Sequence, residues 1–319
     1  MGFRKRSPIF LILALFPVFA LPLNTSPAQE SGSHTTTLKV SGATIDVTLP
    51  DGQMKLSRQD LLGWVKASAS TVADYYGHFP VPHLTLNIRS ASGSGIRHGV
   101  TYPKGGGLIL ISVGRDADIA ATKDDWVLVH EMIHLAFPSM EDDQHWIEEG
   151  ISTYVEPVAR AREGGMQVKE VWGTFVRDMP KGEPEPGDQG LDHTHTWGRT
   201  YWGGALFCLL ADVRIHERTR NHKGLEDALR AINRGGGNIS EDWDIQKALA
   251  LGDKATGATV LRDLYKEMRD KPAPVDLEQL WTKLGIAMKD GTVAFNDKAP
   301  EASIRRAITA PPSSMSARR

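Results

Sequence analysis

Cysteine is almost absent from this sequence of 319 residues, in which Cys208 is the only one. A single cysteine excludes an intramolecular disulfide framework, so the chain has to be held together by its core, in which Cys208 is expected to pack. Charge of one sign is not in excess either, because 37 Lys and Arg balance 39 Asp and Glu to a formal net charge of −2. That balance excludes the basic surface typical of nucleic-acid-binding proteins. The glycines at 105–107 lack the G-x-x-x-x-G-K-[ST] pattern, which excludes a phosphate-binding loop of that class.

One long apolar run is present, and it lies near the N-terminus. Basic residues 4–6 precede apolar residues 9–20, and small residues follow up to Ala28, which is the pattern of a signal peptide. The run is short for a membrane span. We therefore expect residues 1–28 to direct export to the periplasm or the medium, with cleavage after Ala20 or Ala28 and no membrane span afterwards. The alternative is a retained N-terminal anchor. Removing Arg4, Lys5 and Arg6 subtracts three positive charges and takes the formal net charge from −2 to about −5.

The most specific motif is His130-Glu131-Met-Ile-His134, inside an apolar stretch with helical spacing. Residues four apart lie on one face of an α-helix, so His130 and His134 can both present a ring nitrogen to one tetrahedral Zn²⁺. Glu131 then lies beside the metal without binding it, where a carboxylate can take a proton from water that zinc activates. Two structural histidines are the alternative, but burying both without partners would be costly. The motif therefore predicts a zinc site with Glu131 as general base.

A third zinc ligand has to come from another segment, because a catalytic zinc site uses three protein ligands. The helix predicted after the motif carries two adjacent carboxylates, Glu148 and Glu149. They lie about 100° apart around the helix axis, so only one of them can face the metal. Spacing alone does not choose between them.

The motif at 130–134, followed by Trp146-Ile-Glu-Glu-Gly-Ile-Ser-Thr-Tyr154, resembles the gluzincin metallopeptidases, especially the aminopeptidase N and glycyl aminopeptidase groups. Those families carry a W-x-x-E-G-x-x-x-Y type helix after H-E-x-x-H. Matched residue by residue, the resemblance places the third zinc ligand on Glu149, immediately before Gly150, and gives Glu148 a non-ligand position. The spacer is shorter here than in aminopeptidase N, which favours a compact relative over that family proper.

Two further segments acquire roles from the same resemblance. Arg199-Thr-Tyr-Trp-Gly-Gly-Ala205 looks like the Y-x-x-G-a helix of those families, which implies that the Tyr201 hydroxyl binds the oxyanion of the tetrahedral intermediate. A tyrosine that merely packs at a helix start is the alternative. In these families an edge strand before the zinc helix pairs with the extended substrate, and the apolar run Leu108–Val113 is the candidate here. A central strand without contact to substrate is the alternative for that run.

One motif of the aminopeptidase N relatives is missing, namely the G-x-M-E-N string whose glutamate holds the free amine of the substrate. The resemblance therefore implies hydrolysis without implying aminopeptidase specificity, and an endopeptidase or a peptidase of narrow range is equally open. A Pro- and Gly-rich loop at 181–197 carries His193 and His195, which could bind substrate or stabilise charge. Solvated loop histidines are the alternative, and zinc ligation by this pair is a further one.

The remaining pattern predicts an α+β chain, and its organisation resembles the thermolysin-like fold, which implies two lobes with zinc in the cleft. Residues 29–138 are expected to form a mixed lobe of sheet and helix that includes the zinc helix, residues 139–310 a mainly α-helical lobe that carries the third ligand and Tyr201, and residues 311–319 a disordered tail. Within the first lobe the pattern predicts a strand or hairpin at 36–49, strands at 83–89 and 108–113, and a helix at 57–76 capped by Ser57. It also predicts a loop at 90–99 and a zinc helix from Thr122 to Phe137 with Asp125 in its capping box. In the second lobe it predicts a helix from Asp143 to the Glu156-Pro157 pair and further helices at 205–217, 225–233, 242–251, 259–270 and 275–284.

The function that the sequence predicts is that of an exported, zinc-dependent metallopeptidase acting on peptides or proteins. Two rival functions belong to other classes: a pseudo-peptidase that keeps zinc to organise a binding surface, and a zinc hydrolase of a non-peptide substrate. Glu131 weighs against the first, because a structural zinc has no use for a free carboxylate beside it. No residue weighs against the second, and the sequence specifies no oligomeric state.

Overall fold

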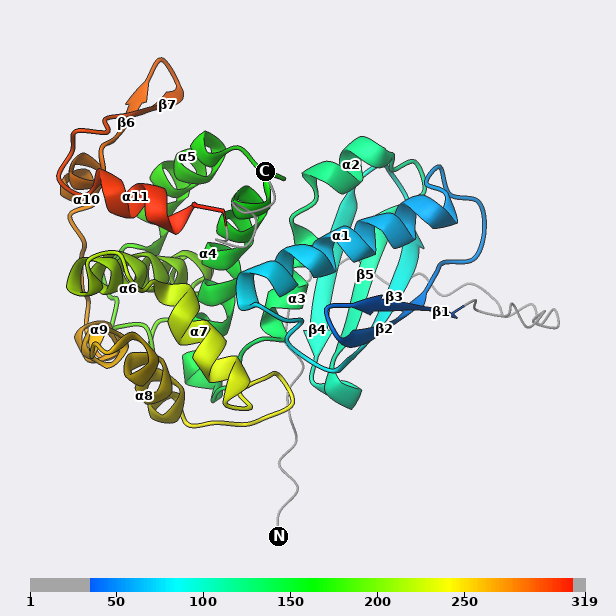
Figure 1. Cartoon of the computed structure of the whole chain (residues 1–319), viewed down its shortest axis with the longest axis horizontal. Coiled ribbons are helices and arrows are strands. Elements are labelled where there is room, and N and C mark those ends of the chain that lie inside the picture. Colours follow the sequence, from blue (N-terminus) through cyan, green and yellow to red (C-terminus); the bar gives the residue numbers. More distant parts are fainter. Residues whose placement is uncertain (1–34, 312–319) are drawn as a thin grey trace, which may run out of the picture. The chain divides into compact units, whose positions relative to one another are not determined.

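The structure, a computed structural model, describes residues 35–311 (Figure 1). The predicted signal peptide at 1–28 and residues 312–319 of the predicted tail lie outside the described residues. A five-stranded sheet with strand order β1-β2-β3-β5-β4 forms the first part of the described chain. The second part is mainly helical, so the predicted α+β class is confirmed.

The sheet is built from one hairpin and two parallel pairings. β1 (Thr35–Val40) and β2 (Ala43–Thr48) are antiparallel, and both turn residues between them, Ser41 and Gly42, have positive φ (46° and 87°), as a tight two-residue hairpin turn requires. β3 (His83–Ala91) pairs in parallel with β2 on one side and with β5 (Leu108–Gly114) on the other. The strands predicted at 36–49, 83–89 and 108–113 are therefore confirmed.

The last strand in the order is β4 (Ile96–Tyr102), which is antiparallel to β5 and contacts the zinc-motif helix. The loop predicted at 90–99 is wrong in its second half, because β4 begins at Ile96. The small residues of this segment do not show the pattern of a strand, and β4 forms because it pairs with β5. Just before β4, the Gly95 carbonyl accepts a hydrogen bond from the Gly114 N–H at 2.9 Å. The run Leu108–Val113, which the resemblance suggested as the edge strand, forms β5 and lies between β3 and β4. The edge strand on this side of the sheet is β4.

Helix α1 (Arg58–Tyr76) crosses one face of this sheet (Figure 1). The predicted Ser57 cap is confirmed as a capping box: Ser57 Oγ accepts from the Asp60 N–H at 3.1 Å, and the Ser57 N–H donates to the Asp60 carboxylate at 3.0 Å. The helix buries Trp64, Val65 and Val72 among other side chains and ends at Gly77, which adopts the left-handed conformation.

The predicted zinc helix is in fact two helices. α2 (Ile119–Asp124) is short, and α3 (Val127–His134) carries the H-E-x-x-H motif. Asp125 lies between them with an extended backbone, so the start predicted at Thr122 is wrong. The Asp125 carboxylate instead caps α3 directly, accepting hydrogen bonds from the Val127 and Leu128 N–H groups at 3.0 and 3.2 Å. Trp64 of α1 donates to the same carboxylate at 3.1 Å, which fixes α3 against α1.

Helix α4 (His145–Glu163) follows the short 3₁₀ turn η2 (Asp142–Gln144). The end predicted at Glu156-Pro157 is wrong, because the helix runs through Pro157 and stops at Gly164. Proline in a helix interior costs a backbone hydrogen bond, but Val155, Val158 and most of the neighbouring side chains are buried and keep the segment helical. Asp143 belongs to the 3₁₀ turn and does not cap α4.

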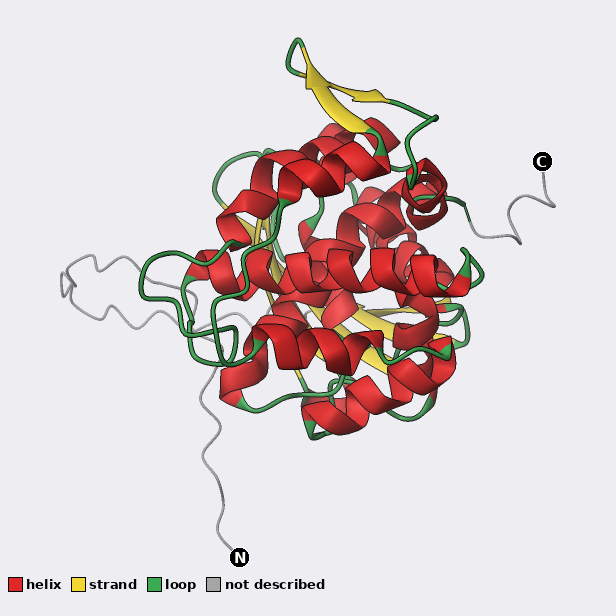
Figure 2. Ribbon diagram, turned by 90° about the vertical axis from the view of Figure 1, so that its left-hand side faces the viewer, coloured by secondary structure: helices red, strands yellow, loops and turns green. Residues whose placement is uncertain are grey.

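Further helices complete the mainly helical part of the described chain (Figure 2). They are α5 (Val168–Asp178), α6 (Gly204–Thr219), α7 (Leu225–Arg234), α8 (Ile245–Thr256), α9 (Val260–Met268), α10 (Leu277–Leu284) and α11 (Ala302–Ile308). A hairpin of β6 (Ile286–Lys289) and β7 (Thr292–Phe295), which the sequence did not predict, projects from this group in Figure 2. Within residues 35–311, none of the helices has the length and apolar character needed to cross a membrane.

Candidate metal centre

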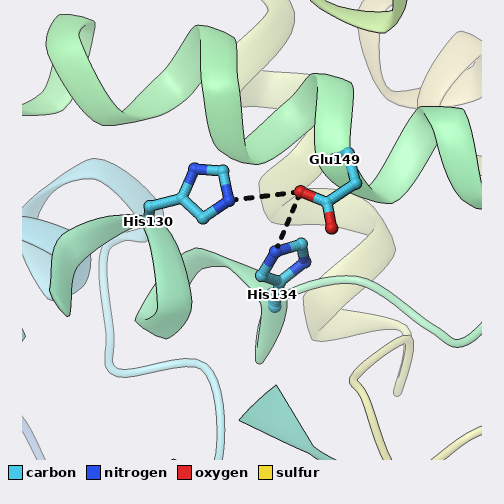
Figure 3. A group of neighbouring side chains, drawn as sticks. All are labelled: His130, His134 and Glu149. Carbon is cyan, nitrogen blue, oxygen red and sulfur yellow. Dashed lines mark hydrogen bonds and ion pairs between the residues drawn. The ribbon is translucent and has the colours of Figure 1, made fainter. Parts of the chain in front are cut away.

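The two histidines of the motif lie on one face of α3, as the four-residue spacing predicts. Their ring centroids are 5.0 Å apart, and both side chains are largely buried. The face opens towards α4, which contributes Glu149 (Figure 3). Glu149 Oε2 lies 3.2 Å from His130 Nε2 and 3.5 Å from His134 Nε2.

These three side chains fit a tetrahedral metal ion. Ligand atoms about 2.0–2.2 Å from a tetrahedral zinc lie about 3.3–3.6 Å from one another. The two measured contacts of Glu149 Oε2 fall at or next to that range, and one ligand atom from each of the three residues lies within 4.8 Å of the others. Although burial raises the pKa of Glu149, the adjacent histidines hold it well below its ordinary value, so this side chain is a carboxylate. The donor set of two imidazoles and one carboxylate is suited to zinc.

The neighbouring Glu148 points elsewhere. Its Oε1 accepts from the Met140 N–H at 3.1 Å, and its Oε2 lies 2.9 Å from His145 Nδ1. Of the two carboxylates that spacing left open, the structure therefore turns Glu149 towards the histidines.

His145 is a member of this site that the sequence did not single out. Its Nε2 lies 3.3 Å from Glu149 Oε1, the oxygen that faces away from the motif histidines. Burial lowers the pKa of His145, but hydrogen bonds to Glu148 and Glu149 outweigh it and raise the pKa to about 10. A cationic His145 thus holds the second oxygen of Glu149 and orients the first. The spacing of three and four residues from the two glutamates on one helix was the available signal.

Glu131 lies beside the triad and is held from the edge of the sheet. Thr101 of β4 places its hydroxyl 2.6 Å from Glu131 Oε2 and 3.0 Å from the Glu131 carbonyl oxygen. Gly99 of the same strand leaves room for the side chain, because a methyl group there would lie 2.4 Å from Glu131 Cγ. Glu131 is 8% exposed and Thr101 is 3% exposed, so this contact is shielded from water. Thr101 was not predicted as a site residue, because no strand was predicted between the loop at 90–99 and the run at 108–113.

Tyr201 reaches the same site from a π-helical turn, η4 (Gly198–Gly203), that leads into α6. Its pKa is raised, first by burial and then by the negative charges of the nearby Glu149 and Glu131. The hydroxyl is therefore protonated and able to donate. Turns of π-helix are rare and occur frequently at functional sites.

Two glycines set the distance between α4 and α6. A methyl group on Gly150 would lie 2.3 Å from the Gly204 carbonyl carbon, and one on Gly204 would lie 2.1 Å from the Trp146 carbonyl oxygen. Only glycine permits the two backbones to approach so closely. Glu149 precedes the first glycine and Tyr201 lies three residues before the second, so this contact brings the two side chains together.

The two loop histidines do not join the triad. His193 Nε2 pairs with Asp270 at 3.0 Å, and His195 Nε2 lies 3.7 Å from Asp143. Both side chains are about half exposed. Neither belongs to a possible metal-binding group among residues 35–311.

A second cluster with metal-binding residue types, Asp212, His216 and Glu226, lies between α6 and α7. Asp212 accepts a hydrogen bond from the Tyr154 hydroxyl at 2.7 Å, and Glu226 forms an ion pair with Arg162 at 3.0 Å. Burial first, and then the charge of Glu226, raises the pKa of Asp212. These contacts, together with His216 Nε2 at 3.4 Å from Asp212 Oδ1, join α4, α6 and α7 in one buried cluster.

Comparisons with known proteins find relatives in structure only. No known family profile matches the sequence, and no curated protein sequence matches it. An aminopeptidase N family protein from Idiomarina loihiensis matches with a TM-score of 0.60 and 12% identity, over 84% of this chain and 53% of that one. A variant of the M1 zinc metallopeptidase from Deinococcus radiodurans matches with a TM-score of 0.51 and 14% identity, over 76% of this chain and 52% of that one.

The chain thus spans about half the length of these solved structures. At such low identity the likeness concerns the fold. Along the chain, the sheet is followed by α3 with the motif at 130–134, by α4 with Glu149, and by the mainly helical part. This order agrees with the fold predicted from the motifs at 130–134 and 146–154. The chain therefore has the α+β fold of these aminopeptidase N family and M1 zinc metallopeptidase structures.

Proposed function

We propose that this chain is a zinc-dependent metallopeptidase. The observation that carries the proposal is the convergence of His130, His134 and Glu149 on one point, with Glu131 beside them and outside the ligand set. The three would hold the ion. Zinc bound there lowers the pKa of water to about 7 and polarises a carbonyl group.

The other steps of the reaction are assigned to protein side chains. The Thr101 hydroxyl donates a hydrogen bond to Glu131 Oε2, so Oε1 is the oxygen that accepts a proton from the attacking water and passes it to the leaving nitrogen. Tyr201 donates its hydroxyl proton in a hydrogen bond to the oxyanion that forms on the scissile carbonyl. His145 holds the far oxygen of Glu149.

The substrate path follows from the sheet. β4 pairs with β5 on one side, and no other described strand pairs with its second edge. We assign the substrate-pairing role to this strand, because an extended peptide can add to such an edge through its backbone. β4 reads Ile-Arg-His-Gly-Val-Thr-Tyr and contains no carboxylate that would hold a free amine. Cleavage within chains and removal of terminal residues therefore both stay open.

The test is hydrolysis of an unbiased peptide library by the chain from Gln29 onward, with products identified by mass spectrometry. We expect cleavage that a chelator abolishes and zinc restores, and that is lost in Glu131→Gln while one zinc per chain is retained. The product ends then distinguish internal cutting from trimming. Absence of cleavage by the zinc-loaded chain would contradict the proposal and favour a zinc-bearing binding protein, and cleavage only of non-peptide esters or amides would favour the other rival.

We also propose that the protein is exported. The support is the basic residues 4–6 and the apolar residues 9–20 that follow them. Fractionation of expressing cells, with N-terminal sequencing of the product, tests this. A chain that keeps its first residues and stays with the membrane fraction would indicate an anchor instead.

A further inference from the structure

Two tryptophans beside the metal centre are more exposed than large apolar side chains usually are. Within residues 35–311, four large hydrophobic side chains are exposed: Ile119 (51%), Trp126 (53%), Trp197 (56%) and Met288 (49%). An aromatic ring left half in water next to a candidate site is a typical ligand-contacting feature. The other two lie in elements that contribute no residue to the site, Ile119 in α2 and Met288 in β6, and provide internal controls.

Each indole contacts a side chain of the site. The ring centroids of Trp126 and His130 are 5.7 Å apart at an interplanar angle of 88°, and those of Trp197 and Tyr201 are 5.8 Å apart at 28°. In both cases the tryptophan precedes its partner by four residues on a helical segment. Residues four apart share a helix face, so each indole lies on the same face of its segment as the site residue that it contacts.

The two indoles approach the centre from different elements. Trp126 borders α3 on the side of a proposed zinc ligand, and Trp197 borders η4 on the side of the proposed oxyanion donor. A peptide whose scissile carbonyl lies between the metal and Tyr201 presents one side chain on each side of the cleaved bond.

The exposed surface of the indoles favours apolar partners. Aromatic side chains bury about 150–250 Å² when fully covered, so each half-exposed indole still offers roughly half of that area. The Lys181 ammonium lies 5.7 Å from the Trp197 ring centroid, and its charge is balanced by Asp178, which binds that ammonium at 2.7 Å. A large apolar or aromatic side chain gains the most contact on such a surface, whereas glycine or alanine gains almost none.

We propose that Trp126 and Trp197 form side-chain subsites that select peptides with a large apolar or aromatic residue next to the cleaved bond. This inference rests on the proposed peptidase function and adds its substrate class. Each indole serves one side of the bond, so the two subsites are separable by mutation.

The first experiment compares cleavage of the same peptide library by Trp126→Ala, Trp197→Ala, Ile119→Ala and Met288→Ala. We expect the unaltered chain to prefer Phe, Tyr, Trp or Leu beside the cleaved bond. Each tryptophan variant should lose roughly tenfold of the kcat/KM preference for these residues over Ala, on one side of the bond only. The two control variants should keep the preference. An unaltered chain that cuts without regard to side-chain size, or tryptophan variants that keep the same preference, would overturn the inference while leaving the peptidase function intact.

The second experiment does not depend on turnover. Calorimetric titration of zinc-loaded Glu131→Gln with a peptide carrying Phe, and with the same peptide carrying Ala, measures binding selectivity directly. We expect about tenfold tighter binding of the Phe peptide, with the difference lost when Trp126→Ala or Trp197→Ala is added and partly kept with Trp197→Phe. Equal binding of both peptides would overturn the subsites. Selective binding by a chain that cuts nothing would overturn the peptidase function and leave the binding site standing.

Discussion

Replacing Thr101 by valine should slow the chemistry without removing the metal. Valine has nearly the shape of threonine but no hydroxyl, so the change deletes the 2.6 Å hydrogen bond to Glu131 Oε2 and leaves the packing of β4 in place. The carboxylate would keep its position beside the zinc ligands but lose the contact that fixes which oxygen faces the water.

The size of the effect follows from the contact. Hydrogen bonds to charged groups contribute about 1.5–3 kcal/mol, which corresponds to a rate factor of about 10 to 150. The Thr101 hydroxyl has one proton and two acceptors, because the Glu131 carbonyl oxygen lies 3.0 Å away. We therefore expect the lower part of that range, a fall in kcat of about ten- to thirtyfold with KM nearly unchanged.

The assay is steady-state kinetics on a peptide identified in the library, with zinc content and thermal unfolding measured on the same samples. Thr101→Ser retains a hydroxyl and should recover most of kcat. A double-mutant cycle with Glu131→Gln, measured on the free energy of unfolding of the zinc-free chain, should show a coupling of about 1–2 kcal/mol. An unchanged kcat in Thr101→Val, or equal losses in the valine and serine variants, would refute the positioning role.

Two further changes test the site, and a third tests a buried acid of α4. Gly150→Ala or Gly204→Ala should destabilise the fold by about 2 kcal/mol or more and separate Glu149 from Tyr201, which a lowered Tm and lost activity would reveal. His145→Ala should weaken zinc binding about 10- to 100-fold by releasing the second oxygen of Glu149, as measured by competition with a chelator; an unchanged affinity would deny His145 its orienting role. Burial raises the pKa of Glu156 from 4.5 to about 7, so the folded state retains this proton when the unfolded state has lost it. Stability should then fall as pH rises from about 4.5 to 7, by up to about 3 kcal/mol, and denaturant titrations of Glu156→Gln should lack this slope.

Much of the fold was predictable because it depends on short stretches of sequence. The β1–β2 hairpin, the Ser57 capping box and the helices after Tyr201 follow from alternation, turn residues and helical spacing. The errors occurred where tertiary partners supply what the local pattern lacks. β4 obtains its pairing from β5, and Pro157 is retained in α4 by buried neighbours. Asp125, which was predicted inside the first turn of one helix from Thr122, instead separates α2 from α3.

By itself, the sequence determined the pair of histidines on one helix face, with Glu131 next to the first of them, because a four-residue spacing in a helix fixes their relative directions. It also supplied two adjacent carboxylates in the following helix without choosing between them. The tertiary structure turned Glu149 towards the histidines and brought Tyr201 close to it through the contact of Gly150 with Gly204. It also placed Thr101 against Glu131 and His145 against Glu149. Spacing fixes directions only within one element. Distances between elements depend on how their backbones pack, and for that reason only the folded chain decided which of these side chains meet.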